Sequence, residues 1–131
     1  MAFFRYGKFI SLLAIAVLYS SAAVAAEDGN AHNGADIFTE QCSICHSVKA
    51  GKNKIGPSLA GVVGRKAGSI ANFAYSDAMK NSGLEWTKEN LTIYLKKPNA
   101  MIAGIKMPYD GLADEKARSD LIAFLSMQAG Q

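Results

Sequence analysis

The feature that most constrains this chain is the segment Cys42-Ser43-Ile44-Cys45-His46, which contains both cysteines of the 131-residue sequence. Two cysteines three positions apart, followed directly by a histidine, are typical of covalent haem attachment. Each thiol can add to one vinyl group of a porphyrin, and the residue after the second cysteine then lies over the iron. The motif therefore predicts one haem c, bound through thioethers at Cys42 and Cys45, with His46 as the proximal iron ligand.

Three other roles for the cysteine pair fit this sequence less well. A thioredoxin-like dithiol needs a strand before the motif and a βαβ arrangement, and no segment alternates with period two. A zinc site needs four ligands, and the one other histidine is His32. A disulfide across three residues would close too small a loop to stabilise the chain much.

The first 26 residues have the layout of a secretory signal peptide. A cationic start with Arg5 and Lys8 is followed by an apolar run over 9–19 and by small residues over 22–26. We expect cleavage after Ala25 or Ala26, which would place the folded chain in the periplasm. An uncleaved anchor is the alternative, because residues 9–26 match the shortest transmembrane helices, which have roughly 17 residues. A membrane-anchored form follows if the leader is not cleaved.

Loss of the leader also changes the charge balance of the chain. Fourteen basic residues become twelve, against eleven acidic ones, when Arg5 and Lys8 are removed. So small a surplus, with no dense basic run interleaved with aromatic residues, excludes nucleic acid as a partner.

The rest of the chain predicts an all-α domain at 34–131, preceded by a flexible arm at 27–33. Apolar residues follow a helical period from Gly34 to Cys45, Thr87 is suited to cap a helix that ends before Pro98, and Asp114 can start a last helix. Residues 47–69 hold five glycines, one proline and five basic residues, which predicts long loops. Loops of this length need an organiser such as a large buried cofactor.

A second axial iron ligand has to come from elsewhere in the chain if the protein is an electron carrier. Four methionines remain after the leader: Met79, Met101, Met107 and Met127. A methionine at helical spacing more often fills a core. Met107 lies between Gly104 and Pro108 in a turn-rich segment, where helix packing does not set its direction, so we expect it to be the ligand.

Further segments follow the haem motif in a fixed order: Gly56-Pro57-Ser58-Leu59, Gly64-Arg65-Lys66, Tyr75-Ser76-Asp77-Ala78, Trp86, Tyr94-Leu95-Lys96-Lys97-Pro98, Gly104-Ile105-Lys106-Met107 and Asp120-Leu121-Ile122-Ala123-Phe124-Leu125. In these segments the stretch 34–127 resembles class I cytochromes c, close to the mitochondrial type and its short bacterial, periplasmic relatives. The resemblance implies the cytochrome c fold, with three main helices, one or two short helices and long loops wrapped around one covalent haem.

The resemblance also implies roles for single residues. Met107 matches the second axial ligand, and Pro57 matches the residue whose carbonyl accepts the imidazole proton of the proximal histidine. The other matches concern haem contacts: Tyr75 and Trp86 with a propionate, Arg65 with its charge, and Tyr94 with the haem near the methionine side. Spacing alone favours Trp86 and Tyr94 as core aromatics and Arg65 as a solvated loop charge. The shared order of all the segments reverses that preference.

The chain departs from the family pattern at several positions near the expected haem. Ile105 stands where a threonine is usual, and Met79 where an asparagine is usual. Pro108-Tyr109 replaces an apolar residue followed by phenylalanine, and Asn99 and Ala100 replace two lysines. These differences bear on the propionate network and on the docking surface.

Together these observations predict a monomeric electron carrier, not an enzyme, with no small-molecule substrate. It would take electrons from a quinol-oxidising membrane complex to a terminal oxidase or other reductase, docking transiently with these complexes and with other electron-transfer proteins at the haem edge. The alternative is a haem peroxidase-like enzyme, which needs an open axial position and a distal acid–base residue. The spare imidazole, His32, lies in the expected arm.

Overall fold

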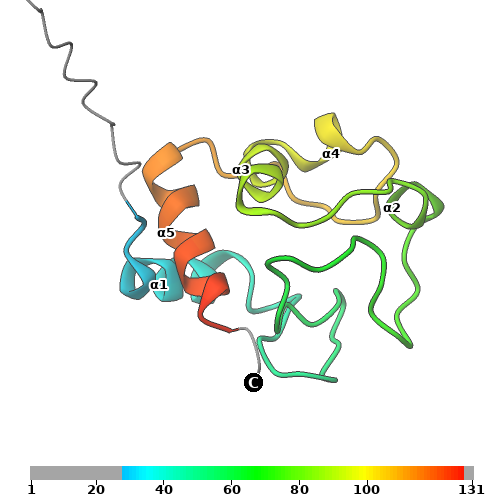
Figure 1. Cartoon of the computed structure of the whole chain (residues 1–131), viewed down its shortest axis with the longest axis horizontal. Coiled ribbons are helices and arrows are strands. Elements are labelled where there is room, and N and C mark those ends of the chain that lie inside the picture. Colours follow the sequence, from blue (N-terminus) through cyan, green and yellow to red (C-terminus); the bar gives the residue numbers. More distant parts are fainter. Residues whose placement is uncertain (1–27, 129–131) are drawn as a thin grey trace, which may run out of the picture.

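Five helices account for the regular structure of residues 28–128, the part of the chain that the computed structural model describes (Figure 1). They are α1 (Ala31–Gln41), α2 (Asp77–Lys80), α3 (Lys88–Lys96), α4 (Pro98–Met101) and α5 (Glu115–Ser126). Within these residues β pairing is limited to one isolated bridge between Lys66 and Glu85. The predicted all-α fold, with three main and two short helices, is thereby confirmed.

Side-chain caps explain where most of these helices begin. Thr87 and Asp114, both predicted from the sequence, accept hydrogen bonds from the backbone N–H groups of the third residue that follows each of them. Ser76 does the same for α2. Helix α4 instead begins with Pro98, whose missing N–H group costs nothing in the first turn. These caps satisfy N–H groups that have no partner inside the helix.

Helix α1 begins three residues earlier than the sequence pattern indicated. Residues 31–33 were expected in a flexible arm, but they belong to the helix because the Asn30 side chain accepts hydrogen bonds from the backbone N–H groups of His32 and Asn33. The predicted signal peptide, residues 1–26, lies outside the described residues. Among the described helices, none is long and apolar enough to cross a membrane.

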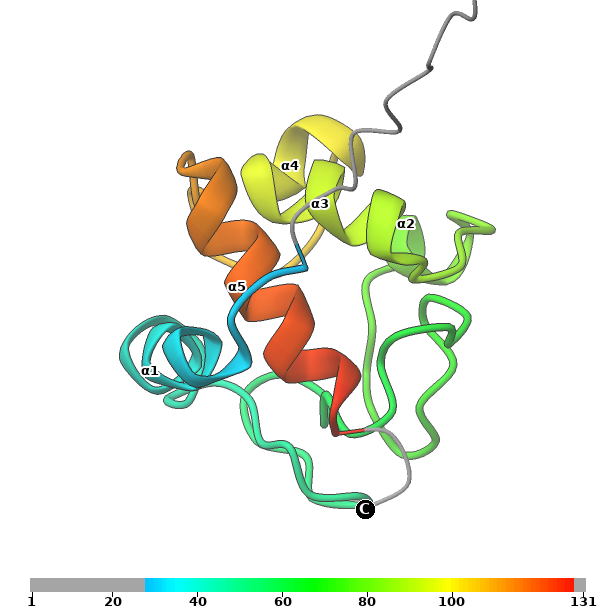
Figure 2. The ribbon, with the colours of Figure 1, turned by 60° about the vertical axis from the view of Figure 1, so that its left-hand side comes forward.

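Helices α1 and α5 cross in close contact, as the views in Figures 1 and 2 both show. Gly34 makes this approach possible, because a Cβ atom there would collide with the backbone carbonyl of Asp120. Next to it, the rings of Phe38 and Phe124 lie with centroids 5.4 Å apart. Leu121 is 1% exposed at the centre of the core. The first and last helices of the described chain are therefore packed directly against each other.

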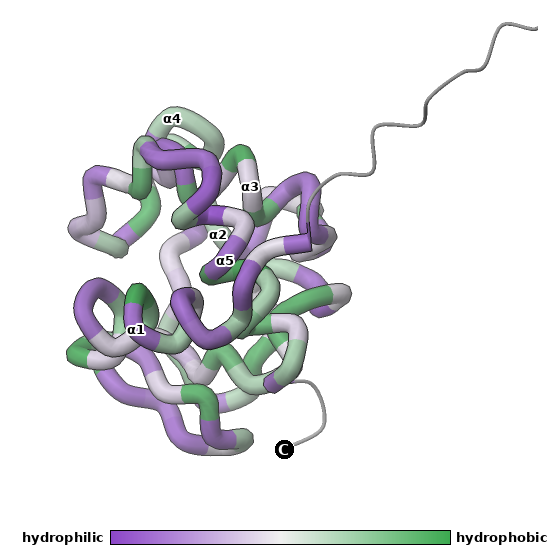
Figure 3. The backbone as a smooth tube through the Cα atoms, turned by 90° about the vertical axis from the view of Figure 1, so that its left-hand side faces the viewer, coloured by the Kyte–Doolittle hydropathy of each residue, from purple (hydrophilic) through white to green (hydrophobic). Residues whose placement is uncertain are grey.

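Loops without regular structure form much of the domain on the side away from the crossing of α1 and α5. Residues 47–76 contain no helix, as predicted for 47–69. The loops nevertheless contribute to the core through Val62, Ala67 and Ile102, each at most 7% exposed. Figure 3 shows hydrophobic segments distributed along these loops as well as along the helices. The loops are therefore held by burial of their apolar side chains rather than by backbone ladders.

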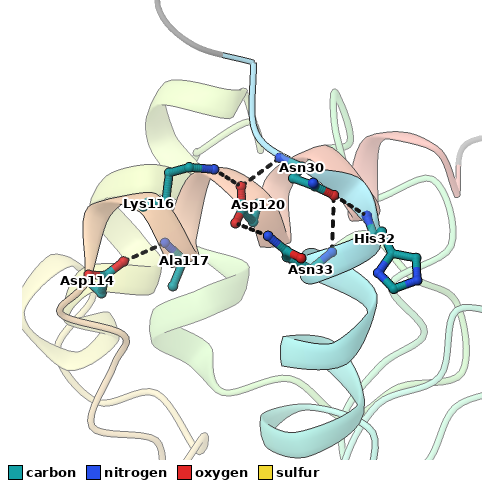
Figure 4. Close-up of polar contacts among 7 residues, drawn as sticks. All are labelled: Asn30, His32, Asn33, Asp114, Lys116, Ala117 and Asp120. Carbon is teal, nitrogen blue, oxygen red and sulfur yellow. Dashed lines mark hydrogen bonds and ion pairs between the residues drawn. The ribbon is translucent and has the colours of Figure 1, made fainter.

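A buried carboxylate joins the start of α1 to α5 (Figure 4). Asp120 accepts a hydrogen bond of 2.6 Å from the backbone N–H of Asn30 and one of 3.3 Å from the side-chain amide of Asn33. The Lys116 ammonium donates to it at 2.7 Å. The Asp120 side chain is 5% exposed. The hydrogen bonds from Lys116, Asn30 and Asn33, of which that from Lys116 is the largest cause, hold the pKa of Asp120 below its usual range.

This pKa depression gives the fold an acid sensitivity that can be measured. The stability from ionised Asp120 is fully present above the unfolded pKa, about 3.9, and is lost as the pH falls through the lower folded pKa. We expect Asp120→Asn to be less stable than the wild type at pH 7 and to show a weaker acid-dependent loss below about pH 4. Urea denaturation across this range measures both effects, with the exposed loop residue Asp110 changed to Asn as the control. Parallel pH profiles for Asp120→Asn and the wild type would contradict the role of Asp120.

Candidate haem-binding site

A cavity of about 290 Å³ lies between the end of α1, helix α3 and the surrounding loops. Its lining is largely apolar and includes Leu59, Val62, Leu91 and Leu95. All nine site residues predicted from the sequence line this one cavity: Cys42, Cys45, His46, Pro57, Arg65, Tyr75, Trp86, Tyr94 and Met107. Folding thus brings together residues from seven separate segments of the chain.

The two cysteines lie on a tight turn that continues the end of α1. The Cys42 N–H donates to the carbonyl of Phe38, and the N–H groups of Cys45 and His46 donate to the carbonyl of Cys42, at 3.1 and 2.8 Å. Both thiols are free and half-buried, so the cysteines are not joined by a disulfide. Burial raises the pKa of the Cys42 thiol to about 11, with Cys45 adding to the effect. The turn fixes both sulfur atoms and the imidazole relative to the helix end.

One ring nitrogen of His46, Nδ1, is hydrogen-bonded to the protein, and no hydrogen bond to the other is found among the described residues. Its Nδ1 lies 2.7 Å from the carbonyl oxygen of Pro57, which can accept a hydrogen bond only from a protonated Nδ1. In the neutral imidazole, a proton on Nδ1 leaves the lone pair on Nε2, the form in which imidazole binds metals. Burial lowers the pKa of His46, while the bond to Pro57 opposes that shift. A neutral, oriented imidazole therefore lines the cavity.

Gly56 permits the close approach between the His46 ring and the neighbouring loop. A Cβ atom at this position would collide with the imidazole. The backbone N–H of Gly56 also donates to the carbonyl of Cys45, at 2.7 Å. The loop that supplies Pro57 is thus fastened directly to the cysteine turn.

Arg65 brings a cation to the cavity wall with part of its hydrogen-bonding capacity unused. Its two terminal nitrogens donate to the carbonyls of Ala60 and Ser58, at 2.9 and 3.0 Å. Its Nε is buried and has no partner within the described residues. Tyr75 accepts from the backbone N–H of Ile70 at 3.3 Å and can still donate its own proton. A half-buried cation and spare donors suit an anionic group such as a carboxylate.

Two aromatic side chains form a rigid part of the wall. Trp86 and Tyr94 are each 7% exposed, and their ring centroids lie 4.7 Å apart. Burial raises the pKa of Tyr94 to about 12, so its hydroxyl stays protonated. Paired thiols, a ligating imidazole, flat aromatic surfaces and a cation with a free donor together fit a haem with its two propionates.

The family model for cytochrome c matches residues 31–128, which include the whole cavity. The chain belongs to the cytochrome c family. It is 48% identical over 103 residues to cytochrome c of Cochliobolus lunatus, a match that covers 78% of this chain and 95% of that one. It is 49% identical over 110 residues to cytochrome c2 of Blastochloris viridis, covering 83% and 85%. Cytochrome c2 of Rhodomicrobium vannielii is 46% identical over 123 residues, covering 93% and 96%.

Family membership identifies the cofactor as one covalently bound haem c and the broad function as electron transfer by a haem protein. The nine predicted residues that line the cavity are the candidates to hold the haem. Cys42 and Cys45 would supply the thioether sulfurs, and His46 would supply an iron ligand through Nε2.

The structure separates the four candidate methionines into two groups. Met107 and Met79 line the cavity, whereas Met101 lines a separate surface groove beside Ile93, and Met127 is 67% exposed. Met101 and Met127 are therefore poorly placed to reach an iron bound in the cavity.

Sequence reasoning missed several residues of the cavity wall. Gln41, Phe73 and Met79 line it, although none of them was predicted as a site residue. Gln41 carried one usable signal, because it directly precedes the first cysteine of the motif. Phe73 packs edge-on against Tyr75 with ring centroids 4.8 Å apart, a contact that the sequence spacing could have suggested.

The Gly56 contact leads to a test of how the proximal imidazole is positioned. Gly56→Ala should push the His46 ring out of place and lower stability by about 1–3 kcal/mol. It should also weaken the far-red absorption band that ferric haem would show with a sulfur ligand. Gly51→Ala is the control, because a Cβ there meets no atom within 4 Å, although its φ of 71° makes the backbone costly. Both variants should lose stability in urea, but the spectrum should change for Gly56→Ala alone. An unchanged band in Gly56→Ala would show that the ring tolerates the methyl group.

Proposed function

We propose that this protein carries single electrons between a quinol-oxidising membrane complex and a terminal oxidase or another reductase, and that it is not an enzyme. The observation that carries the proposal is the pair His46 and Met107, which line one cavity, while the His46 hydrogen bond found among the described residues uses Nδ1 and leaves Nε2 available. Haem, when bound there, supplies a one-electron iron couple. Ligation by histidine and methionine favours the reduced state and hence a high potential.

Residues of the protein would keep the geometry of the haem site fixed while the charge of the iron changes. Pro57 orients His46 and raises the basicity of Nε2. Arg65, Tyr75 and Trp86 would bind and partly neutralise the propionates, and the cysteine turn would fix the haem to the end of α1. Because these groups lie in a packed wall, their positions need not rearrange during electron transfer, which is the main requirement of a carrier.

An exposed apolar patch beside the cavity supports transient docking. Ile44 and Ile55 are 76% and 73% exposed, although large apolar side chains are usually buried. The Lys54 ammonium group donates a hydrogen bond of 2.5 Å to the carbonyl of Ser43. Because Ser43 precedes Ile44 and Lys54 precedes Ile55, this bond ties the two loops together. Lys106 adds a cation at the cavity lining. We propose that membrane redox complexes and other electron-transfer proteins dock on this patch.

The rival function, a peroxidase-like enzyme, needs a distal acid–base residue inside the cavity. His32, the other histidine of the sequence, has a side chain that is 88% exposed at the start of α1 and faces Asp36 at 4.0 Å. It is not among the residues that line the cavity. This placement favours a carrier over an enzyme.

The remaining parts of the proposal concern location and assembly. We propose that the protein acts as a monomer in the periplasm, free or anchored according to whether residues 1–26 are removed. The order of cationic, apolar and small residues in that leader supports export. Intact mass of the native protein tests leader removal and haem attachment in one measurement.

The identity of the sixth iron ligand can be tested by replacing each of the two methionines of the cavity in turn. Met107→Ala should abolish the far-red iron–sulfur band and lower the reduction potential, because the thioether that favours ferrous iron is lost. Met79→Leu should keep the band, and so should Met101→Leu, which changes a residue outside the cavity. If Met79→Leu loses the band while Met107→Ala retains it, the ligand has been assigned to the wrong segment.

The docking surface can be tested by charge reversal at one lysine of the patch. Lys106→Glu should slow electron transfer to an acidic partner severalfold, while Lys88→Glu, at the exposed start of α3, should change it little. Lys116 on α5 would be a poor control, because its ammonium group is bonded to the buried carboxylate of Asp120. The rate should also fall gently with salt, since the Debye length shrinks from about 10 Å at 0.1 M to about 3 Å at 1 M. Equal effects of both reversals, or a rate that rises with salt, would place the docking surface elsewhere.

A further inference from the structure

We infer that the hydrogen bond between Tyr109 and Gln41 is a latch that holds the Met107 loop against the end of α1 and slows dissociation of the methionine sulfur. The inference deepens the proposed function, because it rests on Met107 as the sixth ligand. Tyr109 and Gln41 would be positioning residues, which act on the iron through the loop and do not touch it.

The latch joins the two segments on which the site depends. The Tyr109 hydroxyl donates to Oε1 of Gln41 at 2.6 Å, across 68 positions of sequence. Gln41 is the last residue of α1 and directly precedes Cys42, while Tyr109 follows Met107 by two positions. Both residues line the haem cavity. One hydrogen bond therefore spans from the haem-attachment turn to the loop of the proposed sulfur ligand.

Tyr109 and Met107 are coupled within their own loop. The backbone N–H of Tyr109 donates to the carbonyl of Met107 at 3.0 Å, so a tight turn connects the latch to the ligand. The second side-chain bond from this loop, between Lys106 and the carbonyl of Ala74, is long at 3.5 Å and lies at the surface. Movement of the Met107 backbone away from the cavity would therefore strain or break the latch.

The downstream end of the loop is fixed independently of the latch. The Leu112 N–H donates to the carbonyl of Leu95 at 2.8 Å, and Gly111 lies so close to the Lys96 carbonyl that a Cβ would collide with it. Arg118, 5% exposed, donates to the carbonyls of Leu112 and Ala113 at 2.7 and 2.8 Å. Opening of the loop would thus pivot near residue 111, with the latch at the moving part.

The latch uses the hydroxyl of Tyr109 and not its ring. A phenyl ring at this position could not donate to Gln41. Replacing the tyrosine by phenylalanine therefore removes the bond and leaves the ring in place.

The experiment measures how fast imidazole displaces the sulfur ligand in the ferric holoprotein. At saturating imidazole, the decay of the far-red iron–sulfur band reports opening of the iron–sulfur bond. Tyr109→Phe and Gln41→Leu should each speed this decay by about two- to tenfold, the factor expected for one net hydrogen bond. The double variant should be no faster than either single one, because the same bond is already lost. Gln41→Glu, which keeps an acceptor oxygen, should retain the wild-type rate.

The outcomes separate the latch from the proposed function on which it rests. Unchanged decay in both single variants, or effects that multiply in the double variant, would overturn the latch while leaving Met107 as the ligand. Absence of the far-red band in the wild-type protein would overturn the proposed ligation and the latch together. Faster decay in Gln41→Glu to the level of Gln41→Leu would also overturn the latch, since its acceptor would still be present.

Discussion

The close crossing of α1 and α5 is the contact on which the rest of this structure depends. Gly34 lets the two helices meet backbone to backbone at Asp120, and Phe38 and Phe124 fill the space beside them. The chain between the helices is largely loop, with few backbone ladders of its own. Joining the two ends closes this chain around the cavity, so that residues of distant loops face one another. Without the crossing, the cavity would have no fixed wall.

The features that the sequence could predict are those with a local or strongly patterned signal. Helix starts at Thr87 and Asp114 were predictable because a capping side chain acts within one turn. The cysteine motif was predictable because haem chemistry fixes the spacing of its groups. Five further site residues came only from an ordered series of segments resembling a known family, and the cavity lining includes all five: Pro57, Arg65, Tyr75, Trp86 and Tyr94. Spacing alone did not indicate that Trp86 and Tyr94 line the cavity.

The features that escaped prediction depend on contacts between side chains far apart in sequence. Helix α1 starts at Ala31 because Asn30 caps it and Asp120 holds it, and no local period reports a partner 90 positions away. The contact of Tyr109 with Gln41 has the same origin. The presence of Met79 in the same cavity lining as Met107 could not be foreseen either, since an apolar residue gives no local signal of such a site.

The contact between Asn30 and Asp120 also has a consequence for the order in which the molecule can form. A ribosome releases the N-terminal helix first, yet the carboxylate that fastens this helix, and the surface on which Gly34 packs, belong to the last helix to appear. An isolated helix as short as α1 is marginal in water. The growing chain therefore gains little native structure before its final turn is complete. Such late closure keeps the chain around the cavity open until α5 has been made.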